Sequence, residues 1–189
     1  MPRTARPSTD RILGAAEKVF ARQGYGETSL RQLMAAARVS TTAFYARFDS
    51  KEAVLVALVD RVIGDIQRQA LRAFAAVKSP EEGVETGVDV LLTVIADHKR
   101  VLGLALGEAG SSAPLRATMS RAYRALVSLM TLQLGGAGRE ALAWAFVGAV
   151  HLQVVRWAVF EEIDHEELRA ALRDVGRALV PAISRGRQP

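Results

Sequence analysis

The side chains best suited to chemistry in this chain are gathered between residues 28 and 51. Hydroxyl groups exchange hydrogen bonds with base edges, arginine and lysine bind guanine or phosphate, and alanine offers apolar contact to a thymine methyl group. The candidates for such contacts are Thr28, Arg31, Ser40, Thr41, Thr42, Ala43, Tyr45, Arg47 and Lys51. Their types and close spacing predict recognition of a nucleic acid.

The distribution of charge agrees with a polyanionic partner. The chain has 189 residues and a formal net charge of +5, and residues 1–52 alone hold nine Lys or Arg against five Asp or Glu. A basic terminal segment is compatible with DNA, although solvated basic faces are common. The charge therefore agrees with the residue pattern, but it does not decide between a DNA-binding segment and an ordinary solvated basic face.

Catalytic and metal chemistry are not predicted. The chain has no cysteine, which excludes disulfides and thiolate ligands. His98 and His151 lack the spacing and the clustered carboxylates of a metal site. The glutamates near residues 161–167 are typical of a solvated turn. We expect no catalytic residue, no metal and no cofactor.

Local signals place the candidate contacts on two short helices and a turn. Ser29 and Gln32 have the spacing of a capping box for a helix that ends near Arg38. Ser40 caps a third helix, Thr41 to Phe48, which Phe44 and Phe48 anchor through one stripe. Two helices joined by so short a turn predict a helix-turn-helix, whose second helix enters the DNA major groove.

Two phosphate contacts are expected beside this motif. Lys51 and the free N–H groups at the start of the fourth helix would form one of them. Thr28 and Arg31, at the start of the second helix, would form the other.

The whole chain has helical periodicity and is predicted to be all-α, with about nine helices. Residues 1–52 form the DNA-binding domain, and residues 53–189 form a larger helical body. The nine helices are expected at 9–23, 29–38, 41–48, from 51 onward, 80–97, 98–110, 113–134, 139–160 and 165–185. Glu82 and Glu167 complete further capping boxes with Ser79 and Asp164.

The penultimate helix is apolar almost all round, so one monomer cannot bury all its faces. Residues 139–185 are therefore predicted to form a homodimer interface. Two-fold symmetry would require two half-sites in a roughly palindromic operator.

The body also offers the composition of a small-molecule site, an apolar cavity with a few polar groups. Each candidate could equally be a core residue, so this set is the weakest of the predictions. The candidates are His98, Met119, Tyr123, Met130, Trp144, His151 and Trp157.

The stretch RILGAAEKVFARQGYGETSLRQLMAAARVSTTAFYARFDSKEAVLVAL resembles the N-terminal domain of the TetR family of bacterial regulators. The shared features are ILGAA and VF, then GY and TS, VS, FY, F and SKE. The resemblance implies a DNA-binding head, a dimer formed by the last two helices and a ligand held among the middle helices. It departs from the family at Leu33 and Met34, at Arg38 where a glycine is common, and at Thr42 where a glycine is frequent. If the turn keeps the usual shape, Arg38 would have to adopt a left-handed conformation, which costs about 1 kcal/mol; otherwise the turn differs slightly.

The start of the chain is basic but leads into an amphipathic segment, so no secretory signal is expected. The longest uncharged apolar run, residues 141–155, is too short to span a bilayer. The sequence favours a cytoplasmic homodimeric repressor that a small molecule releases from its operator. The alternative is a helical scaffold or adaptor that binds no nucleic acid.

Overall fold

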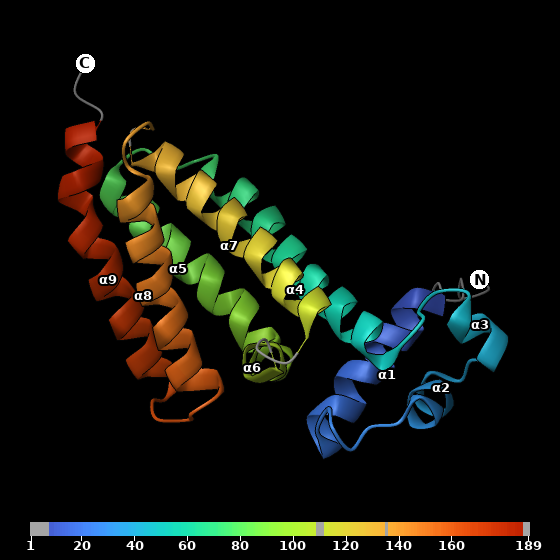
Figure 1. The fold of residues 1–189 in the computed structure, drawn as a ribbon. Helices are drawn as coiled ribbons and strands as arrows, with labels where there is room; N and C mark the ends of the chain where they lie inside the picture. Colours follow the sequence, from blue (N-terminus) through green and yellow to red (C-terminus); the bar gives the residue numbers. More distant parts are fainter. Residues whose placement is uncertain (1–7, 109–111, 135, 187–189) are drawn as a thin grey trace, which may run out of the picture. The chain divides into compact units, whose positions relative to one another are not determined.

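The computed structural model describes residues 8–108, 112–134 and 136–186, and within them it is entirely helical (Figure 1). The order of elements confirms the predicted all-α class with nine helices. The helices are α1 (Ser8–Gln23), α2 (Leu30–Ala37), α3 (Thr41–Tyr45), α4 (Lys51–Phe74), α5 (Pro80–Asp97), α6 (Lys99–Glu108), α7 (Ala113–Gln133), α8 (Glu140–Ala158) and α9 (His165–Gly186).

The predicted boundaries hold to within two residues at most ends, with one larger error. α3 was expected to reach Phe48 but ends at Tyr45, because Ala46 caps it and the chain tightens into a turn in which the Arg47 N–H donates to the Phe44 carbonyl at 2.8 Å. Phe48 still lies in the core, 8 % exposed. The predicted end of α6 at Gly110 lies outside the described residues.

The capping predictions hold in detail, apart from one partner. At α9, the Asp164 N–H donates to the Glu167 carboxylate at 2.8 Å and the Glu167 N–H donates back at 2.9 Å. Ser79 caps α5 by accepting from the Glu82 N–H, but the Glu82 carboxylate accepts from the Lys78 N–H and not from Ser79. The sequence spacing located this helix start correctly and chose the wrong backbone donor.

Contacts divide the chain into two compact units. The first unit is 1–61 with 100–118, and the second is 62–99 with 119–189. The domains predicted from sequence, 1–52 and 53–189, are defined by expected function and stay a prediction. In the first unit, α1 packs against α2 and α3 around a core of buried apolar side chains that includes Ile12, Phe20, Leu33, Phe44 and Leu55.

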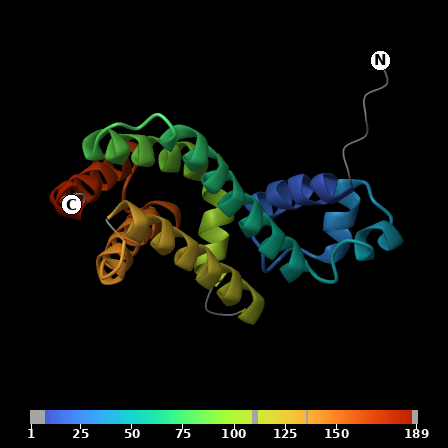
Figure 2. The same ribbon diagram turned by 90° about the horizontal axis from the view of Figure 1, so that it is seen from above.

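In the second unit, α9 packs along α5 and α8 (Figure 2). Arg173 and Arg177 of α9 bind Glu85 of α5, with N–O distances of 2.8 and 3.1 Å. Gly176 lies so close to α5 that a Cβ atom there would be 2.4 Å from Val84 Cγ1. α7 and α8 share an apolar cluster of Val127, Leu134, Ala143 and Val147.

Among the described residues, α8 is the one helix long and apolar enough to cross a membrane. This helix extends over 19 residues and so continues beyond the 15-residue uncharged run seen in the sequence. Only 22 % of the apolar window is buried within the chain. A helix that packs against another protein on its open face meets the same criterion.

Candidate nucleic-acid interface

The first helix of the motif, α2, begins as the sequence predicts. Ser29 has extended backbone angles, and its hydroxyl accepts from the Gln32 N–H at 3.3 Å. The Gln32 side chain accepts in return from the Ser29 N–H at 2.8 Å. This reciprocal pair satisfies two of the N–H groups that a helix start leaves open. Leu33 and Ala37 are buried and hold α2 against α1.

The turn after α2 is closed by Arg38 in the left-handed region, with φ 53° and ψ 49°. The Arg38 N–H donates to the Ala35 carbonyl and the Val39 N–H to the Met34 carbonyl, both at 3.1 Å. These bonds satisfy carbonyls at the end of α2. The expectation that Arg38 would accept this strained conformation is confirmed.

The second helix of the motif, α3, is short and held by one buried face. Ser40 caps it by accepting from the Ala43 N–H at 3.2 Å. Phe44 is fully buried and lies 6.1 Å from the ring of Phe48. The opposite face is open: the exposed candidates for base or phosphate contact are Ser40, Thr41, Thr42, Tyr45 and Arg47, with Ala43 half-buried beside them.

Of the two residues expected to bind phosphate at the start of α2, the structure leaves only Arg31 exposed. Thr28 is 2 % exposed. Its hydroxyl donates to the Gly24 carbonyl at 2.6 Å and accepts from Gln23 Nε2 at 3.2 Å. The prediction for the Thr28 side chain was therefore wrong, because the loop between α1 and α2 folds over that hydroxyl and uses it.

Lys51, predicted as a phosphate ligand, has partners within the chain that the sequence did not predict. Its ammonium donates to the carbonyls of Tyr25 and Gly26 at 2.6 and 3.1 Å, and it lies 4.4 Å from the centre of the Tyr25 ring. Tyr25 in turn packs edge-on against Phe20. Lys51 thus ties the loop between α1 and α2 to the start of α4. Sequence reasoning missed Tyr25, since no local spacing links two residues 26 positions apart.

Comparison with known proteins agrees with this geometry. A sequence profile described as "Bacterial regulatory proteins, tetR family" matches residues 12–58, which contain α2, α3 and the start of α4. Residues 12–58 are thus similar to the N-terminal region of TetR-family regulators.

Curated relatives match about half of the chain. The "HTH-type transcriptional regulator EthR" of Mycobacterium tuberculosis is 37 % identical over 105 residues, which is 52 % of this chain and 49 % of the relative. The "Uncharacterized HTH-type transcriptional regulator YuxN" of Bacillus subtilis is 30 % identical over 97 residues, 51 % of this chain and 33 % of that protein. The aligned region thus spans about half the length of EthR and a third of the length of YuxN.

Solved structures extend the likeness to the whole fold. A TetR-family transcriptional regulator from Syntrophomonas wolfei superposes with a TM-score of 0.79 at 20 % identity, covering 92 % of this chain and 95 % of the other. The fatty acid degradation regulator FadR from Bacillus halodurans gives 0.75 at 21 % identity, covering 94 % and 97 %. At this identity the likeness concerns the fold alone, so the second unit has the fold of a TetR-family body.

The seven residues predicted for a ligand site take part in several local groups of contacts in the second unit. Tyr123 and His151 meet across α7 and α8, with Met130 packed against the apolar cluster beside them. Trp157 is buried between Lys99 and His165, and His98 faces Asp65 at 3.4 Å. Trp144 is 43 % exposed on the outer face of α8, and Met119 is half-buried on α7. Helical periodicity predicts which face of each helix points inward, but it does not predict which residues of other helices that face contacts.

The Tyr123–His151 pair has the character of an uncharged polar contact in an apolar setting. The phenol oxygen lies 2.7 Å from His151 Nδ1. Burial raises the pKa of Tyr123 to about 12 and lowers the pKa of His151. Both shifts favour the neutral forms near pH 7, and in the tautomer that carries its proton on Nε2 the phenol O–H donates to Nδ1. Such a pair is able to recognise a polar group on a largely apolar ligand.

Proposed function

We propose that this chain is a sequence-specific DNA-binding regulator whose base-reading element is α3. The observation that carries the proposal is the division of a five-residue helix into a buried Phe44 and exposed hydroxyl groups, with the exposed Arg47 in the turn that follows. Thr41 and Thr42 at its start would contact base edges, with Ser40, Ala43, Tyr45 and Arg47 beside them. Arg31 would bind phosphate, and Lys51 would fix the loop that positions both helices.

A homodimer through α8 and α9 is the second part of the proposal. One face of α8 carries Ala141, Trp144, Ala145, Gly148 and Leu152, all exposed and separated by helical spacing. Small residues between two large ones allow a second helix to approach closely. Burial of this face in a dimer would relate the two copies of α3 by a two-fold axis, and the operator would then be roughly palindromic.

The third part of the proposal is release by a small molecule, which would make the protein a cytoplasmic repressor. α4 is one continuous helix, Lys51–Phe74, whose residues belong to both contact units. A ligand bound in the second unit, with the Tyr123–His151 pair as a polar contact, would shift α4 and change the separation of the two reading heads. A coupling of about 1–3 kcal/mol would suffice for release at moderate ligand excess.

The direct test is fluorescence anisotropy with the duplex that lies upstream of the coding region, titrated from low to physiological salt. We expect a complex that outcompetes a scrambled duplex and a steep loss of affinity with salt. Thr42→Ala should change the base preference at particular positions. Thr93→Ala, which removes an exposed threonine from α5, is the matched control and should change nothing. Absence of binding to any duplex at low salt would favour the alternative, a helical scaffold.

A compound screen by thermal shift tests the ligand-release hypothesis separately. A compound that raises the melting temperature of the free protein should also lower its affinity for the operator. If saturating amounts of such compounds leave operator affinity unchanged, release by ligand is wrong, while DNA binding stands.

A further inference from the structure

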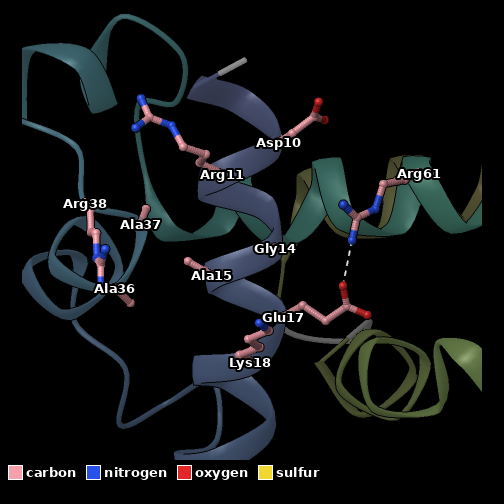
Figure 3. A pocket seen from close by; sticks show the side chains of 10 residues that line it. All are labelled: Asp10, Arg11, Gly14, Ala15, Glu17, Lys18, Ala36, Ala37, Arg38 and Arg61. Carbon is pink, nitrogen blue, oxygen red and sulfur yellow. Dashed lines mark hydrogen bonds and ion pairs between the residues drawn. The ribbon is translucent and has the colours of Figure 1, made fainter. Parts of the chain in front are cut away.

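A depression on the outside of the first unit is lined by α1, the end of α2 and one residue of α4 (Figure 3). Its volume is about 830 Å³, and it is open to solvent. Small residues form the α1 and α2 walls at Gly14, Ala15 and Ala36. A Cβ atom at Gly14 would meet nothing within 4 Å, which confirms open space beside the helix.

Six charged residues line this depression: the acidic Asp10 and Glu17 and the basic Arg11, Lys18, Arg38 and Arg61. In Figure 3, Asp10 and Arg61 lie on the opposite side of the α1 ribbon from Arg38, and Arg61 pairs with Glu17 at 2.6 Å. The side of α1 that faces α2 presents Arg11, and Arg38 stands across from it. Lys18 lines the same depression farther along α1.

Apart from Arg61, which pairs with Glu17, three cations line the depression, and we call them the basic rim: Arg11, Lys18 and Arg38. All three are exposed, and within the described part of the chain none of their side chains makes an ion pair or hydrogen bond. Like charges gathered around one hollow repel one another and raise the local concentration of anions. The rim therefore favours an anionic partner with several charges.

Of the three cations, Arg38 most strongly indicates a function, because its backbone is strained. A left-handed residue at this helix end is ordinarily glycine, which adopts φ 53° without a Cβ clash. Within the described residues, the Arg38 guanidinium makes no hydrogen bond or ion pair that would compensate for the strain. A strained residue at a functional turn is consistent with a side chain that acts on a partner.

We propose that the basic rim binds the sugar–phosphate backbone of the duplex next to α3, with Arg38 making the phosphate contact nearest the reading helix. This inference rests on the proposed DNA binding and adds a second docking strip to it. Arg38 precedes the α3 cap Ser40 by two residues, so their Cα atoms lie within about 7 Å. A duplex engaged by the start of α3 would thus bring phosphates within reach of the long Arg38 side chain.

The spacing along α1 fits a repeating anion. Arg11 and Lys18 are seven residues apart, about 10 Å along a helix. Each DNA strand carries one charge about every 3.4 Å of helix axis, so cations at this spacing can each reach a phosphate. An acidic peptide would satisfy the charge as well, but it would have no connection to the position of Arg38 beside α3.

The test is anisotropy with specific and random duplexes across a salt series, on wild type, Arg38→Gly and the double variant Arg11→Ala/Lys18→Ala. Glycine relieves the backbone strain while removing the cation, so Arg38→Gly should resist denaturant at least as well as wild type. It should nevertheless bind both duplexes roughly tenfold more weakly. The slope of log affinity against log salt should fall in magnitude by about 1 for Arg38→Gly and about 2 for the double variant.

Arg124→Ala is the matched control, because it removes an exposed arginine from α7 and should leave affinity and slope unchanged. If wild type binds but both rim variants keep its affinity and slope, the phosphate strip is wrong and the proposed function stands. A change in base preference in Arg38→Gly, with the slope unchanged, would also overturn it, since a phosphate contact carries no sequence information. If wild type binds no duplex, the proposed function fails first.

Discussion

α3 and α8 show two opposite ways of leaving side chains exposed. α3 is five residues long, buries Phe44 and presents polar groups to solvent, and the exposed Arg47 lies in the turn after it. α8 is 19 residues long and presents tryptophan, leucine and small residues. Water solvates the first surface at little cost, whereas it leaves the second with apolar area that a partner would cover. The contrast suggests that one surface reads a polar ligand and the other assembles the protein.

The largest expected effect comes from a charge on the α8 face. Leu152 is 54 % exposed, so Leu152→Glu should fold normally but place a carboxylate in the proposed dimer interface. We expect a monomer by light scattering. Operator affinity should fall by about 100-fold or more, because each head would then bind its half-site alone.

Leu71→Glu is the matched control for this variant. Leu71 is 80 % exposed on α4, and the same substitution there should leave both mass and affinity unchanged. A Leu152→Glu protein that remains dimeric would show that α8 does not form the interface, and the contrast between α3 and α8 would need another explanation.

Packing inside the second unit should give the next largest effect. Gly176→Ala would put a methyl group 2.4 Å from Val84 Cγ1, so α9 or α5 must shift. We expect the free energy of unfolding, measured with denaturant, to fall by about 2 kcal/mol. Gly14→Ala, where the structure leaves open space, should not destabilise the protein.

A rescue distinguishes this steric effect from a change in helix propensity. Val84→Ala removes the obstructing methyl groups, so the double variant should recover part of the loss. Simple addition of the two single losses would show that Gly176 and Val84 are not coupled.

Substitution of Lys51 tests whether a cation of the first unit stabilises the fold or binds phosphate. Lys51→Met should lower the free energy of unfolding of the DNA-free protein by about 1.5 kcal/mol, because two carbonyls and the Tyr25 ring lose their partner. Arg31→Ala removes an exposed cation and should leave stability unchanged while weakening DNA binding. Equal stability for wild type and Lys51→Met would return Lys51 to the role of a phosphate ligand.

The smallest expected effect is the acid sensitivity of the Tyr123–His151 pair. Because burial lowers the pKa of His151, the unfolded chain takes up a proton near pH 6.5 before the folded chain does. The free energy of unfolding should therefore fall as the pH drops below 6.5, and His151→Asn should reduce this slope. Denaturant melts at several pH values measure it. A steeper slope in the variant would contradict the assigned direction.

Prediction from sequence succeeded where the cause is local. Capping boxes, the strain at Arg38 and the anchors of α3 depend on residues within a few positions of one another, so spacing is sufficient. It failed for Thr28, whose hydroxyl the folded loop covers, and for Lys51, whose partners lie 25 and 26 residues away. The contact partners of the pocket candidates could not be predicted for a related reason. Periodicity gives the inward face of a helix but not the residue that it meets on another helix.

The central claim is that α3 reads DNA sequence, and selection of duplexes from a random pool tests it most directly. Dimeric wild-type protein should enrich one motif made of two inverted half-sites, with centres about 10 base pairs or a multiple of this apart. Thr42→Ala should enrich a motif changed at the same position in both halves. Recovery of the starting pool without enrichment, at salt concentrations where the protein still binds duplex, would contradict the account.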